Sequence, residues 1–318
     1  MQNDILVVTP VFNDWDCLVR LLEELDQTLF NADVVADVLA VDDGSSQSWS
    51  RIKNRPTKFV HIKKVNILHL TRNLGHQRAV AIGLAYANAN YAYQQIIVMD
   101  SDGEDRTTDV KNLVDEQRLH PHELIFGQRV ARSESLVFRA FYLVYKILFR
   151  WLTGATISFG NFSSIPAELL GRVVHLSEIW NHYAAGIVHS KITWRVIPTP
   201  RGTRYSGKSH MSFIFLVLHG LSAISVFLDV ISVRLIVFSF VIIFAEGIGV
   251  AFLLWLNFLT KWVIPGWAIT GTFGLVIITV QMLIFLGILS LSVLNNRGMR
   301  LLIPARDFLD FVSTIEKM

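Results

Sequence analysis

The chain has 318 residues, of which 52% are hydrophobic and 17% charged, whereas roughly a quarter of the residues in an ordinary soluble domain are charged. The charges are unevenly distributed, with 44 Lys, Arg, Asp and Glu residues in positions 1–210 and 11 in positions 211–318. This distribution argues against a purely soluble protein and predicts a soluble unit followed by a membrane unit. The net charge of +3, without a cluster of Lys and Arg interleaved with aromatic residues, predicts no nucleic-acid partner.

The chain begins with Met1–Asp4 and then enters an apolar segment, with neither the basic start nor the apolar length of a signal peptide. We therefore expect the first unit to stay in the cytoplasm. The single cysteine, Cys17, cannot form an intrachain disulfide, which fits a reducing compartment.

Positions 1–210 alternate short apolar runs with helical patterns. Continuous apolar runs, typical of strands buried on both faces, predict five strands at Ile5–Val8, Val38–Val41, Ile67–Leu70, Ile96–Met99 and Leu124–Phe126. Helical spacing between them predicts helices at Cys17–Leu29, His76–Ala89 and Val110–His120. This order is typical of a Rossmann-like α/β fold, in which helices cover a mostly parallel sheet.

An apolar run follows at Met211–Leu228, and it could be read in two ways. Its length would allow it to span a membrane. However, Arg204 and Lys208 precede it and Asp229 and Arg234 follow it closely. We therefore favour an amphipathic helix that lies in the membrane interface or on the soluble unit.

Two longer apolar segments predict a transmembrane hairpin. Leu235–Phe258 carries one charge, Glu246, and Trp267–Leu294 carries none; each can cross a hydrocarbon core of about 30 Å as a helix. Arginines gather on one side of the hairpin, so the positive-inside rule places both termini in the cytoplasm. Glycines along both segments favour close helix contacts and a homo-oligomer. We expect Glu246 and Gln281 to form hydrogen bonds across the hairpin or between subunits, although a functional role in the membrane is an alternative.

These patterns predict four parts. They are a cytoplasmic unit at 1–210, an interfacial helix at 211–230, two transmembrane helices within 231–296 and a cytoplasmic C-terminal tail at 297–318.

Polar residues follow four of the predicted strands. The segments read TPVFND (9–14), VDDGSS (41–46), RNLGHQRA (72–79) and MDSDGED (99–105). Any one of them could be an ordinary turn, but together they predict a ligand site, because ligands bind at the carboxyl edge of such sheets. No Gly-x-Gly-x-x-Gly or Gly-x-x-x-x-Gly-Lys segment follows a strand, which argues against a dinucleotide dehydrogenase and a P-loop NTPase.

At these spacings the four segments resemble the family 2 glycosyltransferases of the GT-A fold. With RYSGKSHMS (204–212), HGLSAISV (219–226) and the two-span hairpin, the whole chain is similar to the polyprenyl-phosphate glycosyltransferases of the dolichyl-phosphate-mannose synthase and GtrB-like group. The resemblance implies a membrane-bound enzyme that transfers a hexose, with inversion, from a nucleotide sugar to polyprenyl phosphate on the cytoplasmic face. Glucose from UDP-glucose and undecaprenyl phosphate are the expected substrates, and the lipid-linked sugar would serve later glycosylation.

Asp100 and Asp102 form the candidate metal site. They are separated by one residue beyond a strand, so their carboxylates point the same way and can hold a hard cation against a diphosphate. The resemblance makes them a DxD motif for Mg²⁺ or Mn²⁺, with Asp102 as the main ligand and Asp100 near the ribose or the metal. Glu104 is a third candidate ligand, where dolichyl-type relatives have Gln. A helix cap formed by Asp105 is a compatible structural role.

The resemblance also implies a set of nucleotide-sugar contacts. They are Pro10, Phe12, Asp14, Asp43, Asn73, Asp100, Ser101 and Asp102. Asp14 stands where many relatives have Glu. Uridine is the expected base, and a GDP-mannose donor is the alternative, because no residue decides between them.

The acceptor phosphate needs positive charge rather than a base. A phosphate monoester is largely ionised at pH 7, so no general base is required, and arginines can hold it by bidentate hydrogen bonds. The candidates, each of which could also be a surface residue, are Arg129, Arg139, Arg201, Arg204 and Lys208. Arg129 resembles the arginine of the family's Gly-Ser-Arg motif and joins Asp100 and Asp102 as a catalytic candidate. The segment 204–210 resembles the family's mobile loop.

Other candidates are weaker. The segment Thr156–Phe162 lacks the Asp of dolichyl-type relatives, which argues against an essential base there, and we expect His76, His182, His189 and His219 to be structural. Two alternative functions remain. One is transfer to another lipid or to a polysaccharide, although KITWR (191–195) does not match the Gln-x-x-Arg-Trp motif of processive synthases. The other is a non-enzymatic membrane scaffold, which the intact DSD segment and the arginines disfavour.

Overall fold

The computed structural model describes residues 5–52, 56, 58–129, 136–206, 213–260, 266–298 and 300–317. The chain divides into two compact units. The sheet unit contains residues 1–144, 155–226 and 301–318, and the hairpin unit contains residues 145–154 and 227–300. We describe each unit by itself.

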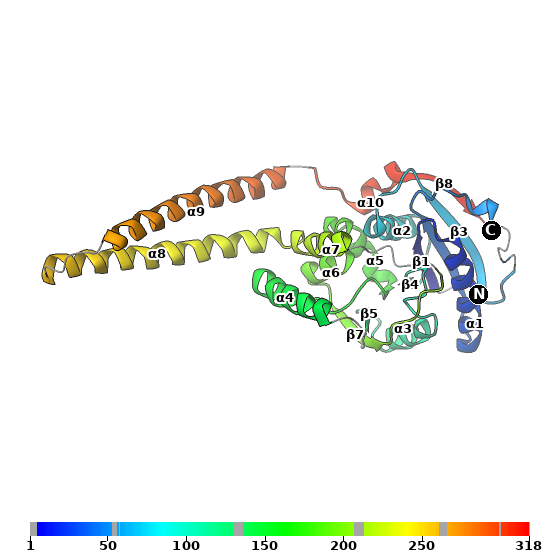
Figure 1. The fold of residues 1–318 in the computed structure, drawn as a ribbon. Helices are drawn as coiled ribbons and strands as arrows, with labels where there is room; N and C mark the ends of the chain where they lie inside the picture. The colour runs from blue at the N-terminus through cyan, green and yellow to red at the C-terminus, as the bar shows by residue number, and fades with distance from the viewer. Residues whose placement is uncertain are drawn as a thin grey trace. The chain divides into compact units, whose positions relative to one another are not determined.

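The sheet unit contains one eight-stranded sheet with the order β7-β5-β6-β4-β1-β2-β3-β8 (Figure 1). Its strands are β1 (Ile5–Val11), β2 (Ala36–Asp42), β3 (Ile62–Leu70), β4 (Gln95–Val98), β5 (Leu124–Arg129), β6 (Ser163–Pro166), β7 (Trp194–Thr199) and β8 (Val312–Lys317). β4, β1, β2 and β3 pair in parallel, as do β5 and β7, whereas β6 and β8 run antiparallel to their neighbours. The expected mostly parallel α/β sheet is confirmed.

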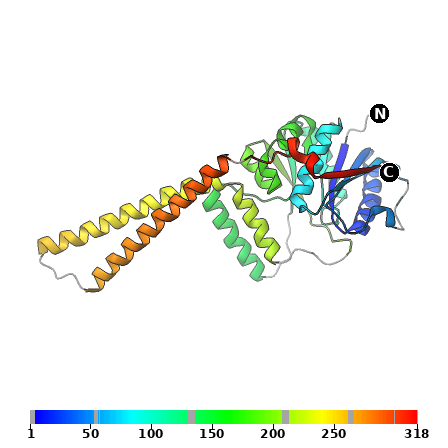
Figure 2. The same cartoon turned by 90° about the horizontal axis from the view of Figure 1, so that it is seen from above.

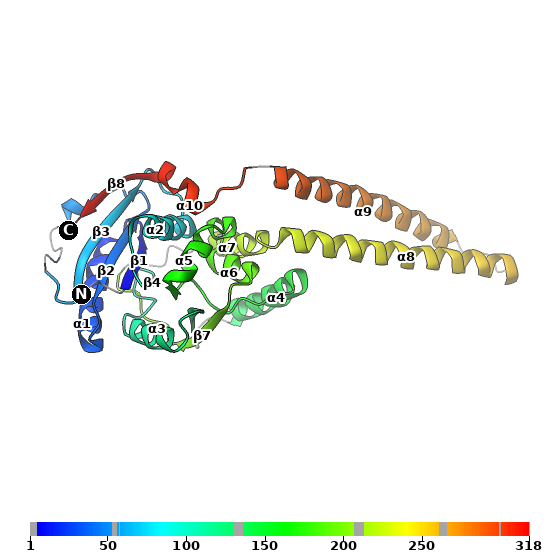
Figure 3. The same cartoon turned by 180° about the vertical axis from the view of Figure 1, so that it is seen from behind.

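Helices cover both faces of this sheet. On one face α1 (Trp15–Ala32) and α3 (Thr108–Leu119) pack in one hydrophobic cluster, and Figure 3 shows α1 beside the sheet. On the other face lie α2 (His76–Asn90), α5 (Ala167–Val174) and α6 (Tyr183–Ser190). β1 and β2 are buried along their whole length, and their sequences are mostly apolar, as is typical of strands covered on both faces. The five strands and three helices expected from the sequence are all present.

The C-terminal segment differs from the expected tail. α10 (Pro304–Asp307) is followed by β8, which pairs with β3 at the edge of the sheet, with Asn66 opposite Lys317 and His69 opposite Thr314. Thr71 N also donates a hydrogen bond to Phe311 O (2.9 Å). Residues 301–317 therefore belong to the sheet unit rather than to a free tail.

α7 (Phe213–Ser225) belongs to the sheet unit and is a short apolar helix. Its 13 residues rise about 20 Å at 1.5 Å per residue, less than the hydrocarbon core of about 30 Å. Ile214, Leu218 and Leu221 form an exposed stripe at helical spacing, whereas Ala223 is buried.

The hairpin unit contains α8 (Leu228–Thr260), α9 (Gly266–Gly298) and the last part of α4 (Leu136–Thr153) (Figure 2). Within them, Leu228–Phe252 and Thr270–Asn295 are long and apolar enough to cross a membrane. Glu246 of α8 accepts a hydrogen bond from the Thr279 hydroxyl of α9. This is the contact between helices that the sequence led us to expect.

Candidate active site

The four polar segments meet at the carboxyl edge of β1, β2, β3 and β4. Asn13 N donates to Ser45 Oγ (2.9 Å), and Ser46 N donates to Asn13 Oδ1 (2.8 Å), which joins the loops after β1 and β2. Ser101 Oγ donates to Pro10 O (3.1 Å), which joins the loop after β4 to β1. The structure therefore gathers residues that lie up to 91 positions apart at one edge of the sheet.

Asp43 fixes the loop after β3. Its two carboxylate oxygens accept hydrogen bonds from Leu74 N (2.7 Å) and Gly75 N (2.9 Å). Burial raises the pKa of Asp43, and these two backbone hydrogen bonds oppose the increase. Gly44 follows with φ +73°, and a side chain there would come within 2.6 Å of the Arg72–Asn73 backbone. A glycine at this turn is what lets the two loops touch.

The other expected nucleotide contacts differ in exposure. Pro10 is buried in β1, whereas the Phe12 side chain is 46% exposed and Asn73 is exposed. Asn13 adopts φ +52°, a left-handed conformation that Asn tolerates better than most residues. The loop after β1 thus presents the Phe12 ring to solvent at the edge where the four segments meet.

The turn after β4 concentrates negative charge. Burial, followed by repulsion from Asp102, raises the pKa of Asp100 to about 7, and burial with the charge of Asp100 raises the pKa of Asp105 to about 7. Asp105 Oδ2 accepts from Asp100 N (3.0 Å), and its Oδ1 accepts from Arg129 Nη2 (3.0 Å). Arg129 Nη1 also donates to Glu104 Oε2 (2.9 Å). Arg129 therefore neutralises part of the acidic turn from the end of β5.

The acidic turn fits a hard divalent cation. Asp100 Oδ1 is buried and accepts no hydrogen bond from any residue that the structure describes, although it lies 3.3 Å from His76 Nε2. Asp102 Oδ2 already binds a cation, the guanidinium of Arg204. Carboxylate oxygens of this kind are the ligands that Mg²⁺ and Mn²⁺ prefer. In the described part of the chain, no three His, Cys, Asp or Glu side chains form a ready metal cluster, so a bound ion would need further oxygens from a ligand.

Glu104, the third candidate metal ligand, is held by two arginines. Arg129 binds one carboxylate oxygen, and Arg201 Nη2 donates to the other, Oε1 (2.7 Å). Burial alone would raise the pKa of Glu104, but the hydrogen bond from Arg201 and the charge of Arg129 lower it overall. Its role as a metal ligand stays a prediction.

Two of the expected acceptor residues lie on the segment after β7, which we call the strap (residues 200–206). Arg201 contacts Glu104, and Arg204 contacts both Asp14 and Asp102. The Arg139 side chain and Lys208 lie outside the described residues. The structure thus brings Arg129, Arg201 and Arg204 to the acidic turn.

His76, which we expected to be structural, lies beside Asp100. Tyr183 N donates to Gln77 Oε1 (2.6 Å), Gln77 Nε2 donates to Asn161 Oδ1 (3.3 Å), and Asn161 Nδ2 faces His76 Nε2 (2.7 Å). Because a backbone N–H can only donate, the orientation of both amides follows and His76 Nε2 is the acceptor. Sequence reasoning missed this chain, although the GHQ segment follows a strand end as the other polar segments do.

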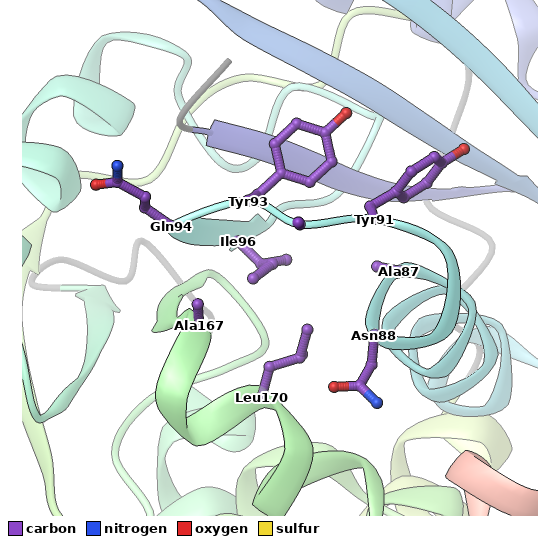
Figure 4. Close-up of a pocket in the computed structure, with 9 residues that line it drawn as sticks. Ala87, Asn88, Tyr91, Tyr93, Gln94, Ile96, Ala167 and Leu170 are labelled. Atoms are coloured by element: carbon purple, nitrogen blue, oxygen red, sulfur yellow. The ribbon is translucent and has the colours of Figure 1, made fainter. Parts of the chain in front are cut away.

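A separate cavity of about 320 Å³ lies near the amino end of β4, away from the polar segments (Figure 4). Ala167 and Leu170 of α5 face Ala87 and Asn88 of α2 across it. Its remaining lining residues are Tyr91, Ala92, Tyr93, Gln94 and Ile96. This lining contains no carboxylate, histidine or basic side chain, so the charged site is the stronger candidate for chemistry.

Comparison with known proteins gives consistent matches. The glycosyl transferase family 2 model matches residues 6–173. An uncharacterized glycosyltransferase of Synechocystis is 24% identical over 182 residues, which is 56% of this chain and 55% of that protein. An undecaprenyl-phosphate 4-deoxy-4-formamido-L-arabinose transferase of Klebsiella pneumoniae is 27% identical over 130 residues, 41% of this chain and 38% of that protein.

The chain spans about half the length of the first of these relatives. Among solved structures, glucosyl-3-phosphoglycerate synthase of Mycobacterium tuberculosis in complex with Mn²⁺ and UDP-glucose has a TM-score of 0.47 at 13% identity, over 72% of this chain and 79% of that one.

Proposed function

Because the chain belongs to the glycosyl transferase family 2, we propose that it transfers a hexose from a nucleotide sugar to a polyprenyl phosphate at the cytoplasmic face of a membrane. Glucose from UDP-glucose is the proposed donor group, and undecaprenyl phosphate is the proposed acceptor. The observation that carries this proposal is the acidic turn of Asp100 and Asp102 beside three arginines, in a chain that also has two membrane-length apolar helices.

The acidic turn would hold the donor. Asp102, with Asp100 beside it, is the proposed ligand set for Mg²⁺ or Mn²⁺, and Glu104 is a further candidate. When bound, such an ion neutralises charge on the leaving diphosphate. Phe12, exposed after β1, is available to the base, while Asp43 holds the loop that carries Asn73.

The arginines would hold the acceptor. A phosphate monoester is already a nucleophile at pH 7 because it is largely ionised, so the protein has to bring it in line with the sugar rather than deprotonate it. Arg129, Arg201 and Arg204 each carry a guanidinium that can bind phosphate oxygens in pairs. Attack of the phosphate oxygen on the anomeric carbon breaks the bond to the nucleoside diphosphate and inverts that carbon.

The acceptor proposal has support from a relative and from the apolar helices. The Klebsiella pneumoniae relative is named as a transferase that uses undecaprenyl phosphate. The exposed apolar faces of α8 and α9, with Phe244 72% and Leu291 68% exposed, suit a lipid environment. We also propose a homo-oligomer within the membrane, which crosslinking in native membranes tests.

The test is a donor screen. Purified protein receives undecaprenyl phosphate, Mg²⁺ or Mn²⁺ and one nucleotide sugar at a time, and mass spectrometry identifies the lipid product. We expect a hexose-phosphate lipid with UDP-glucose. If a product forms only with GDP-mannose, the donor assignment changes to GDP-mannose. If no common donor gives a lipid product, the proposed function is refuted.

Asp102→Asn tests the acidic turn in the same assay. We expect the transfer rate to fall by at least about 100-fold, the order of loss seen when a group that stabilises developing charge is removed. Asp115→Asn, which removes an exposed carboxylate of α3 paired with Lys111, is the control and should keep nearly full activity. Equal activity of the Asp102 and Asp115 variants would contradict the assignment.

A further inference from the structure

The strap lies in direct contact with the acidic turn. Gly202 N donates to Glu104 O (2.9 Å), and Tyr205 N donates to Asp102 O (2.8 Å). Gly103 has φ +88°, and a side chain there would come within 2.9 Å of the Tyr205 ring. The glycine therefore allows both the left-handed turn and the close approach of the strap.

Arg204 sits between two carboxylates that belong to different loops. Its Nη2 lies 2.5 Å from Asp14 Oδ2, its Nη1 lies 2.9 Å from Asp102 Oδ2, and its Nε donates to Ser206 O (2.9 Å). The three side chains are each only 19% exposed. All three guanidinium nitrogens are therefore engaged, in a place where water screens charge only partly.

A cation at this point is required by the charges around it. The Arg204 guanidinium lies between the carboxylates of Asp14 and Asp102. Two mostly buried carboxylates this close repel each other unless a positive charge lies between them. A divalent ion on Asp102 Oδ2 would have to share that oxygen with Nη1, and the ion and the guanidinium repel each other. The two cations are therefore alternatives at Asp102.

We propose that Arg204 occupies the cation position at Asp102 when no divalent ion is bound, and that an incoming ion displaces it. The released guanidinium, still carried by the strap, can then bind an anionic group of a substrate. Binding of the divalent ion therefore also makes the positive charge of Arg204 available to that substrate. This inference rests on the proposed function only for the presence of a divalent ion.

The strap has other anchors that do not involve Asp102. Tyr205 Oη donates to Glu24 Oε2 (2.7 Å), the Arg20 guanidinium lies 4.9 Å from the centre of the Tyr205 ring, and Cys17 Sγ lies 3.2 Å from Ser206 Oγ. These contacts hold the strap on α1. A change in the Arg204 side chain is therefore enough for the exchange, and the strap backbone keeps its place.

The test measures Mn²⁺ binding without any sugar nucleotide or lipid. The full-length protein in detergent is titrated with Mn²⁺, and electron paramagnetic resonance gives the free ion at fixed pH and ionic strength. We expect Arg204→Gln to bind Mn²⁺ about 10-fold more tightly than the wild type, which corresponds to about 1.4 kcal/mol. Arg204→Lys keeps the charge but loses the fork of nitrogens that contacts Asp14 and Asp102 at once, so its Mn²⁺ affinity should fall between the other two.

Arg20→Gln is the matched control, because it removes a positive charge and a strap anchor without freeing Asp102. We expect it to change Mn²⁺ affinity less than about twofold. The proposal is overturned if Arg204→Gln binds Mn²⁺ no more tightly than the wild type, or if Arg20→Gln gains as much affinity. Because no donor or acceptor is present, a failed transfer assay would not contradict the Mn²⁺-binding result. Likewise, a failed Mn²⁺-binding test would not contradict the proposed sugar transfer.

Discussion

His182 is a buried histidine that stays uncharged. Its side chain accepts a hydrogen bond from Ala185 N (3.2 Å) and caps α6, and its ring lies 4.4 Å from that of His219 on α7. Burial, followed by the charge of His219, lowers the pKa of His182 to about 3. Burial also lowers the pKa values of His76 and His219. The His182 imidazole is therefore neutral at pH 7.

This arrangement predicts loss of stability in acid. The unfolded chain binds a proton at His182 near pH 6.5, whereas the folded protein does so only near pH 3. Stability is therefore complete above about pH 6.5 and decreases as the pH falls from there towards 3, by roughly 2 kcal/mol at pH 5 for this one group. Thermal melting in detergent at pH 7 and pH 5 measures the decrease.

His182→Asn keeps a capping side chain and removes the titrating ring. We expect its melting temperature to fall less between pH 7 and pH 5 than that of the wild type. An equal fall in both proteins would mean that other groups govern the acid response.

At the residue scale, the sequence indicated where polar groups gather but not what each one contacts. The nucleotide contact expected of Asp43 stays a prediction, and the sequence did not indicate that both of its carboxylate oxygens bind the loop after β3. His76 was expected to be structural, yet it lies beside Asp100. Such partners come from loops that meet only after the sheet has formed, so local spacing does not encode them.

At the scale of elements, the Glu246–Thr279 hydrogen bond joins α8 and α9. If the two helices span a membrane as we propose, the lipid offers these groups no other hydrogen-bond partner. Hydrogen bonds between membrane helices contribute about 0.6 kcal/mol on average and up to about 1.7 kcal/mol. This supports a structural role for the single carboxylate in the first apolar segment.

We predict that Glu246→Gln, which can still accept from Thr279, keeps transfer activity and thermal stability. Glu246→Ala should lower the melting temperature, and Thr279→Val should lower it to a similar degree. The melting temperature of the double variant should fall by less than the sum of the two single decreases, because each change removes the same contact. Loss of transfer activity in Glu246→Gln at unchanged stability would instead indicate a functional carboxylate.

Elements were predictable where their apolar pattern was long and regular. β1, β2 and α1 have such patterns and were found. The missed strands lack them: β6 reads SSIP, β7 contains Pro198, and β8 reads VSTIEK, with only two apolar residues. What specifies these three is pairing with strands far away in the chain, which no local window contains.

At the scale of the molecule, β8 restricts the membrane topologies that we can propose for the chain. β8 pairs with β3 in one sheet, so the chain before the apolar helices and the chain after them are on the same side. The number of crossings between the strap and β8 must therefore be even. We predict that α8 and α9 are the two crossings and that α7 does not cross, which agrees with its 13-residue length and its exposed apolar stripe.

Single-cysteine labelling tests this topology. In a Cys17→Ala background, we place one cysteine at Val60, Leu309 or Leu259, each more than 60% exposed, and treat intact cells with a membrane-impermeant maleimide. We expect the first two sites to react only after the membrane is opened, and Leu259→Cys, at the end of α8, to react in intact cells. Labelling of Val60→Cys and Leu309→Cys from opposite sides would mean an odd number of crossings.

The pairing of β8 also sets an order of events during synthesis. Asn66 of β3 pairs with Lys317, 251 residues later in the chain. At about 5–20 residues per second, the ribosome needs roughly 10–50 s to make that stretch, and both apolar helices emerge within it. Until then β3 presents an open edge, which is a site for wrong pairing with other chains. The sheet can close only after the hairpin has been made, so a completed sheet marks a chain whose hairpin has already left the ribosome.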